Sequence, residues 1–131
     1  MEYNIYINAK KISKASLSAL EEYKKRLSVS VKVNIYYGKQ TKITDISKND
    51  FIYDICTGNT SYDSVELSKQ LYSKATHGVN KYAFLIGYEN IEYNEVLSLS
   101  SFDISPDILG IMLVEQLYRA YTIDIGKTYH K

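Results

Sequence analysis

Apolar and polar residues follow one another with two different periods along this chain. Residues 3–7 and 31–37 alternate apolar with polar side chains, which is typical of half-buried strands. Between them, residues 16–27 place apolar side chains three and four positions apart, as an amphipathic helix does. The apolar stripe of that helix is formed by Leu17, Leu20, Tyr23 and Leu27. The first part of the chain therefore predicts a strand, a helix and a second strand.

A second helix is expected between two further strands, at 51–55 and 82–87. Asp63 or Ser64 can cap the free N–H groups of its first turn, and Gly78 is a natural end. The apolar spine of this helix is Leu67, Leu71 and Ala75. Because residues 82–87 are apolar without alternation, they predict a central parallel strand covered on both faces.

The last part of the chain contains the clearest helix signals. Residues 88–95 are polar and allow a brief helix, and residues 97–100 suggest one more strand. Residues 105–107 (SPD) place a capping serine, a proline at the first helical position and an acid near the positive end of the helix dipole. Every residue over 108–114 is apolar or glycine, so this helix should be buried on all sides. A subunit interface is the simplest cover for its outer face.

The order of these elements predicts the fold class. Strands that alternate with helices are typical of an α/β fold around a mainly parallel sheet. The 131 residues suit one domain over 1–131, and they contain no internal repeat. In such folds, ligands bind where loops leave the C-terminal ends of the strands.

The composition indicates where in the cell the protein works, but it does not identify a binding partner. The sequence has no apolar run long enough to cross a bilayer, no signal-peptide layout at its start and a single cysteine, so we expect a cytoplasmic protein without a membrane partner. The net charge of +1 does not identify a partner. Lys10, Lys11 and Lys14 form a local basic cluster, for which solvated helix faces are the favoured interpretation. The 14 tyrosines could stack on bases, but an AT-rich genome is the preferred explanation.

Short chemical motifs give no reaction by themselves. Gly38 and Gly58 are lone glycines at strand ends and belong to no phosphate-binding pattern. Cys56 with His77 or His130 would be needed for a thiol nucleophile, and a cysteine beside a strand is more often a small buried apolar residue. Two histidines and one cysteine this far apart are a poor metal site, so no metal is expected.

The C-terminal segment 115–131, EQLYRAYTIDIGKTYHK, resembles that of the RlmH-type SPOUT methyltransferases. The run 115–120, then Gly126 and the final 129–131 stand at the spacing of that family. Looser similarity covers most of the chain, at 22–27, at 53–54 followed by Gly58, at 84–87 and at 97–100. The resemblance implies a trefoil-knotted SPOUT fold, a homodimer formed through the C-terminal helix, and S-adenosylmethionine as cofactor.

The same resemblance implies a substrate and a set of site residues. Members of the family methylate N3 of a pseudouridine in large-subunit ribosomal RNA, so ribosomal RNA or the ribosome is the expected partner. The implied catalytic residues are Arg119, Tyr129 and His130, and Arg119 and Lys131 would also hold the substrate. Removal of the target proton suits a group with a tunable pKa such as His130. The implied cofactor-binding residues are Tyr53, Gly87, Ser100, Ser101, Phe102, Asp103, Ile104 and Ser105.

Several positions depart from the family pattern. No charged helix stands between the strands at 31–37 and 51–55, and the second glycine of the family's Ile-Gly-Gly is Tyr88, a bulky residue at the rim of the expected cofactor pocket. The family's proline-histidine pair reads Ser105-Pro106, and an arginine one turn later is Gly110. The alternative function is therefore a catalytically inactive SPOUT-fold paralogue that acts as an RNA-, ribosome- or protein-binding dimer.

Overall fold

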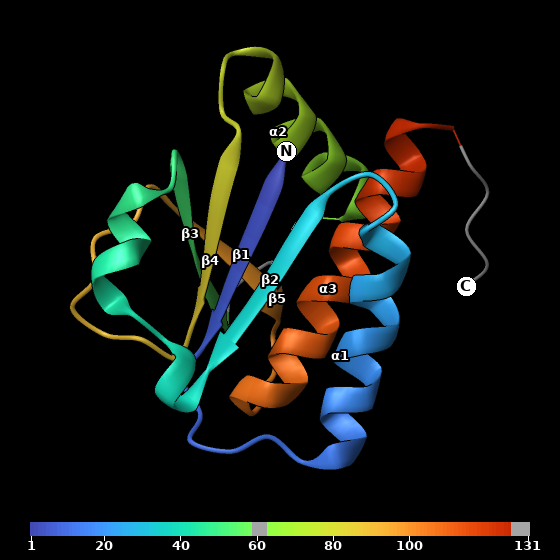
Figure 1. Ribbon diagram of the computed structural model, residues 1–131. Coiled ribbons are helices and arrows are strands. Elements are labelled where there is room, and N and C mark those ends of the chain that lie inside the picture. The colour runs from blue at the N-terminus through green and yellow to red at the C-terminus, as the bar shows by residue number, and fades with distance from the viewer. Residues whose placement is uncertain (59–62, 127–131) are drawn as a thin grey trace.

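The computed structural model describes residues 1–58 and 63–126 as a five-stranded sheet covered on one face by three helices (Figure 1). The strand order is β2-β1-β4-β3-β5, and every strand pair is parallel. The predicted α/β class with a mainly parallel sheet is therefore confirmed, while the threading of a trefoil knot stays a prediction.

The elements follow the order that the hydrophobic pattern predicts. They are β1 (Glu2–Ile7), α1 (Lys14–Leu27), β2 (Lys32–Tyr37), the short 3-10 helices η1 (Gly38–Gln40) and η2 (Ile43–Lys48), β3 (Phe51–Thr57), α2 (Ser64–Thr76), β4 (Lys81–Ile86), β5 (Glu95–Ser100) and α3 (Pro106–Asp124). Asp63 caps α2 by accepting the Glu66 N–H at 2.8 Å, as expected from its short polar side chain. The brief helix expected at 88–95 does not form.

Strand β1 differs from its expected half-buried state. All five residues from Tyr3 to Ile7 are buried, because β1 pairs with β2 on one side and β4 on the other. Its odd-numbered side chains face the helices, and Tyr6 faces a second apolar cluster with Ile46, Ala83 and Leu85. The second cluster is closed by η2 rather than by an α-helix, so the polar connection between β2 and β3 supplies part of the core.

Helix α3 lies between α1 and α2 and packs on the sheet with one face (Figure 1). Leu109, Leu113 and Leu117 on that face are buried. The opposite face is not covered within one chain: Ile108 is 42% exposed, and Ile111 and Met112 are only partly buried. Burial of α3 on all sides therefore does not occur within a single copy.

Tyrosines fill much of the space under the helices. The Tyr53 ring stacks on Phe84 with centroids 5.5 Å apart and an interplanar angle of 6°. Tyr3, Tyr53 and Tyr82 are each 0% exposed. The Tyr82 hydroxyl donates to the Leu71 carbonyl at 2.6 Å, which joins β4 to α2. These tyrosines are thus core residues, and a buried hydroxyl of this kind needs an acceptor.

We predict that Tyr82→Phe lowers the free energy of unfolding by about 1 kcal/mol, because a buried hydrogen bond is removed while the ring stays in place. Chemical denaturation measures this directly. The control is Tyr93→Phe, since Tyr93 is 50% exposed and its change should stay within about 0.5 kcal/mol. Equal stability of the Tyr82 variant and the wild type would show that the hydrogen bond from Tyr82 to Leu71 does not stabilise the fold.

Candidate functional site

The five strands end at one edge of the sheet, at the lower end of the molecule in Figure 1, because all of them are parallel. The residues just after the strands, or at their ends, are Asn8, Gly38, Gly58, Gly87 and Ser100. Loops at this edge are where open α/β sheets bind ligands. The candidate site is therefore assembled from segments far apart in the sequence.

Gly87 forms the centre of this edge. Its φ of +81° is one that side chains rarely allow, and its carbonyl accepts the Asn8 side-chain amide at 2.9 Å. A Cβ atom at Gly87 would lie 3.4 Å from Asn8 Cβ and 3.6 Å from Pro106 Cγ. Gly87 thus lets the ends of β1 and β4 approach the start of α3, and we call Asn8, Gly87 and Pro106 the glycine cradle.

The loop 101–105 is attached at both ends. At its start, the Ser100 carbonyl accepts the Gly58 N–H at 2.8 Å, and the Ser100 hydroxyl accepts the Phe102 N–H at 3.0 Å. Between these attachments the Phe102 side chain is 76% exposed. The loop therefore has fixed ends and an exposed aromatic ring at the edge where a ligand would bind.

The far end of this loop is held by the Asp107 carboxylate. Asp107 accepts the Ser105 hydroxyl at 2.8 Å and the Ser16 hydroxyl at 3.0 Å, which joins the starts of α3 and α1. The Ser105 hydrogen bond, followed by the weaker effects of Ser16 and the first N–H groups of α3, holds the pKa of the Asp107 carboxyl below its ordinary value.

The structure brings together only some of the residues that the family resemblance implies. Gly87 and the loop 101–105 lie at the same edge, together with Ser100. Tyr53 lies elsewhere: it is 0% exposed, and its ring is part of the aromatic core. Residues 129–131 lie outside the described residues.

Arg119 lies at the other end of α3. It pairs with Glu115, and the two side chains are 27% and 18% exposed. Arg119 lies thirteen positions after Pro106, which corresponds to about 20 Å along a helix axis. Nearby, Tyr121 accepts the Ser30 hydroxyl at 2.7 Å, just before β2 begins. Within one chain, Arg119 is therefore at the edge where the strands start, away from Gly87.

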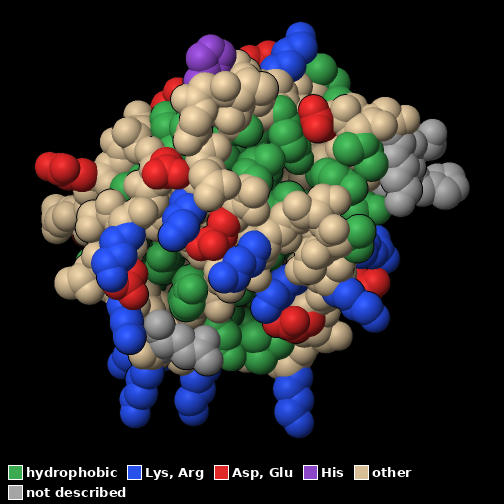
Figure 2. Space-filling model, turned by 45° about the horizontal axis from the view of Figure 1, so that its top comes forward, with side chains coloured by type: hydrophobic (Ala, Val, Ile, Leu, Met, Phe, Trp, Pro, Cys, Tyr) green, Lys and Arg blue, Asp and Glu red, His purple; other side chains and the backbone are tan. Residues whose placement is uncertain are grey.

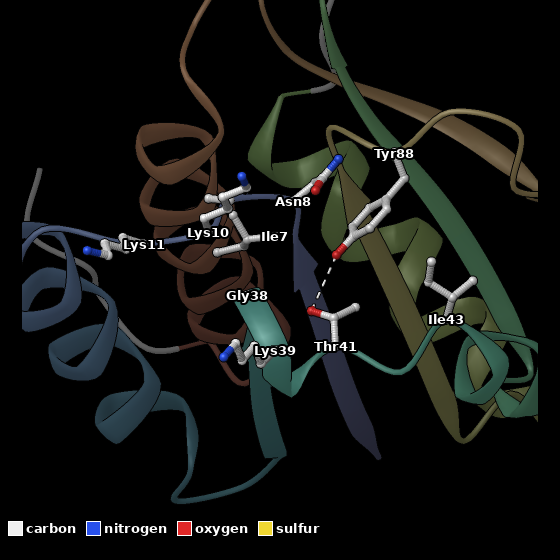
Figure 3. Close-up of a pocket in the computed structure, with 10 residues that line it drawn as sticks. Ile7, Asn8, Lys10, Lys11, Gly38, Lys39, Thr41, Ile43 and Tyr88 are labelled. Atoms are coloured by element: carbon white, nitrogen blue, oxygen red, sulfur yellow. Dashed lines mark hydrogen bonds between the residues drawn. The ribbon is translucent and has the colours of Figure 1, made fainter.

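A pocket lies beside the glycine cradle, between the ends of β1 and β2 and the Tyr88 side chain (Figure 3). Its volume is about 610 Å³, and we call it the basic hollow. It is lined by Ile7, Asn8, Ala9, Lys10, Lys11, Gly38, Lys39, Thr41, Ile43 and Tyr88. The solvated-helix interpretation of Lys10 and Lys11 is wrong, because α1 begins only at Lys14.

The Tyr88 side chain extends toward the end of β2. Its hydroxyl donates to the Thr41 hydroxyl at 3.4 Å, as Figure 3 shows. Since β2 and β5 are the two outer strands of the sheet, this direction leads away from the loop 101–105. The ring therefore does not occupy the space between Gly87 and Pro106.

The cysteine and histidine considered as a possible thiol nucleophile and its base do not lie together. Cys56 lies near the end of β3, whereas His77 follows α2 next to the start of β4, and His130 is outside the described residues. Within 1–58 and 63–126, no three His, Cys, Asp or Glu side chains are grouped as a metal ion would require. In this same part of the chain, no helix is both long and apolar enough to cross a membrane.

A parallel α/β sheet with a glycine cradle, a fixed loop and a helix start at one edge defines a ligand-binding domain of the kind found in many enzymes. The comparison with known families narrows this class. The model of the predicted SPOUT methyltransferases matches residues 1–130. The chain belongs to the SPOUT methyltransferase family, as the segment 115–131 indicates.

Individual relatives agree with this membership. The chain is 31% identical to Ribosomal RNA large subunit methyltransferase H 1 of Thermoanaerobacter sp. (strain X514), over 133 aligned residues and 100% of both proteins. It is 28% identical to a methyltransferase H of Desulfotalea psychrophila, again over 100% of both. For that of Lactobacillus helveticus, the identity is 26% over 86% of this chain and 89% of the relative. The alignment with the first relative covers both proteins completely in only 133 positions, so that relative is about as short as this chain.

We predict that Asp107→Asn lowers the free energy of unfolding at pH 7 by about 0.5–1 kcal/mol, the usual contribution of an acid at a helix start. A folded pKa below the unfolded value means that this stability is present above the unfolded pKa and is lost as the pH falls through the folded pKa. Denaturation of both proteins between pH 7 and pH 2 should therefore show the difference shrinking below about pH 4.

The control for this prediction is Asp103→Asn, which removes an exposed carboxylate from the same loop outside the helix and should change the free energy of unfolding at pH 7 by no more than about 0.5 kcal/mol. An Asp107→Asn difference that is as large at pH 2 as at pH 7 would show that the carboxylate charge is not the cause.

Proposed function

We propose that this protein is an S-adenosylmethionine-dependent methyltransferase that acts on ribosomal RNA, with N3 of a large-subunit pseudouridine as its target. The observation that carries the proposal is the similarity over the whole chain, from the family model at residues 1–130 to relatives that bear the name of this activity. A protein that modifies ribosomal RNA would work in the cytoplasm.

The glycine cradle and the loop 101–105 fit the proposed cofactor. An exposed glycine at position 87 leaves space that a Cβ would fill, so a ligand can approach the backbone closely. The hydroxyls of Ser100, Ser101 and Ser105 can bind polar groups, and the exposed Phe102 ring can cover an adenine. The cofactor supplies the methyl group, so the protein mainly positions donor and acceptor. We leave Tyr53 out of this contact set, because its side chain has no exposed surface.

A second copy of the chain is proposed to complete the site. The outer face of α3 offers the apolar side chains of Ile108, Ile111 and Met112 for an isologous contact. If two α3 helices pack antiparallel, a two-fold axis midway between Pro106 and Arg119 sets each Arg119 opposite the partner's helix start. The same contact would cover the exposed apolar face and bring the arginine to the cofactor loop.

The roles of the substrate-facing residues follow from their chemistry. Glu115 holds the Arg119 guanidinium in place, and the guanidinium is proposed to bind an RNA phosphate. Lys131 would bind a second phosphate. His130 or Tyr129 is proposed to accept the proton that leaves the target nitrogen, since imidazole changes charge near neutral pH.

A non-catalytic dimer that binds RNA, the ribosome or a protein is the second candidate, favoured by Gly110 and by the absence of a histidine beside Pro106. Gly110 has a structural explanation: a Cβ there would lie 2.7 Å from Ile7 Cδ1, so a larger residue would have to displace the Ile7 side chain. The direction of the Tyr88 side chain also leaves the glycine cradle open. Both observations remove an argument against the methyltransferase, while the missing histidine remains an argument for the non-catalytic dimer.

We predict that the wild-type protein binds S-adenosylmethionine in isothermal titration calorimetry and that Gly87→Ala weakens this binding at least tenfold, because the added methyl group occupies the cradle. Gly78→Ala is the matched control, since its φ is also positive but no atom lies within 4 Å of its Cβ. If the wild type does not bind S-adenosylmethionine at millimolar concentration, the methyltransferase proposal is wrong and the non-catalytic dimer is favoured.

We also predict that Arg119→Ala and Gly87→Ala are each inactive on unmethylated large-subunit ribosomal RNA and that mixing them restores activity. Random exchange makes half of the dimers mixed, each with one intact site, so recovery should reach about a quarter of the wild-type rate. Transfer of a labelled methyl group measures it. If the mixture stays inactive while subunit exchange is demonstrated by a tag, Arg119 does not act across the dimer.

A further inference from the structure

The basic hollow has the size and rigidity of a binding site. Its volume of about 610 Å³ lies within the range of small-molecule pockets, which is about 300–1,000 Å³. The Gly38 N–H donates to the Ala9 carbonyl at 2.9 Å and joins the loops after β1 and β2. A Cβ at Gly38 would lie only 2.9 Å from the Lys10 carbonyl oxygen, and its φ is +58°. The two loops are therefore held together before any ligand arrives.

The charge of the hollow is of one sign. Lys10, Lys11 and Lys39 contribute three ammonium groups, and none of the lining residues is acidic. Among the described residues, no ion pair involves these lysines. Figure 2 shows several Lys and Arg side chains extending from the lower border of the molecule. Uncompensated lysines beside a cavity favour an anionic ligand.

The opposite side of the hollow is aromatic and apolar. Tyr88 packs against the second apolar cluster and also lines the hollow, across from the three lysines in Figure 3. Its hydroxyl lies 3.4 Å from the Thr41 hydroxyl on the same side of the hollow. Ile43, which is 59% exposed, adds apolar surface. A cationic rim with an aromatic ring is the combination that binds single-stranded RNA through phosphates and stacked bases.

The hollow also adjoins the proposed cofactor site. Asn8 lines the hollow and also belongs to the glycine cradle, where it donates to the Gly87 carbonyl at 2.9 Å, so the two sites share this residue. We infer that the basic hollow is a second RNA subsite, in which Lys10, Lys11 and Lys39 hold phosphodiesters next to the target nucleotide and Tyr88 stacks on a neighbouring base. This inference rests on the proposed function for the identity of the RNA.

The test measures binding of a labelled single-stranded RNA oligonucleotide to the full chain at several salt concentrations. Replacing Lys10, Lys11 and Lys39 together by Gln should weaken binding about tenfold or more. It should also reduce the log–log slope of the salt dependence by about 0.7 for each phosphate that the variant no longer neutralises. The matched control replaces the exposed Lys25, Lys32 and Lys69 by Gln, which changes the net charge equally. An equally large weakening in both triple variants would overturn the subsite.

A second variant tests the aromatic side of the hollow. Tyr88→Leu keeps apolar packing but removes the stacking ring, and should weaken RNA binding about fivefold or more. Unchanged RNA binding in this variant overturns the role of Tyr88. Because free nucleotides carry the same phosphate chemistry, a uridine monophosphate arm is included. Displacement of the RNA by micromolar monophosphate would overturn the assignment to an RNA strand.

Calorimetry with S-adenosylmethionine on the same lysine variants separates this inference from the proposed function. Unchanged cofactor affinity together with weakened RNA binding supports the subsite. If the wild type binds RNA through these lysines but binds no cofactor, the subsite stands and the methyltransferase proposal fails. If the cofactor binds and RNA is methylated equally well by the lysine variants, the subsite fails and the methyltransferase stands.

Discussion

The close packing of α3 on β1 at Gly110 determines where the candidate residues lie. A Cβ at this position would be 2.7 Å from Ile7 Cδ1 and 3.5 Å from Leu20 Cδ2, so glycine lets the helix lie close against β1 and α1, and a larger residue there would displace the Ile7 side chain. Because α3 is this close to the sheet, Pro106 reaches Gly87, and Asp107 reaches Ser16 at the start of α1. The cradle and the loop 101–105 follow from that packing.

The length of α3 then sets a second constraint. A helix that starts beside Gly87 and runs back over the sheet carries Arg119 about 20 Å away. The proposed cofactor loop and the proposed substrate-binding arginine lie at opposite ends of one helix, so they cannot serve the same reaction centre within one chain. The exposed apolar stripe that begins at Ile108 lies between them, where a second copy would bind. One feature of the sequence, an apolar helix ending in a polar segment, thus accounts for both the proposed dimer and the shared site.

Much of the fold could be predicted from the sequence, because apolar runs and helix-capping residues act on the backbone next to them. The apolar run 82–87 identified the central strand, and Asp63 and Pro106 marked helix starts that the structure shows. Burial of β1 on both faces was missed, since it depends on η2 packing under the sheet. Gly87 and the loop 101–105 came from family resemblance, and the basic hollow was missed because three strand ends form it. The sequence did contain a signal for this hollow: a lysine or lysine pair follows shortly after each of two strands, at Lys10-Lys11 and at Gly38-Lys39.

A net charge of +1 is compatible with RNA binding once the positions of the charges are considered. Where the strands start, opposite charges lie close together, since Lys32 Nζ is 3.8 Å from the Glu2 carboxylate. Where β1 and β2 end, Lys10 and Lys39 line a hollow without an acidic side chain. Phosphate binding depends on such local charge, because salt screens charges more than about 8–10 Å apart. A nearly neutral protein can therefore hold RNA at one edge of its sheet.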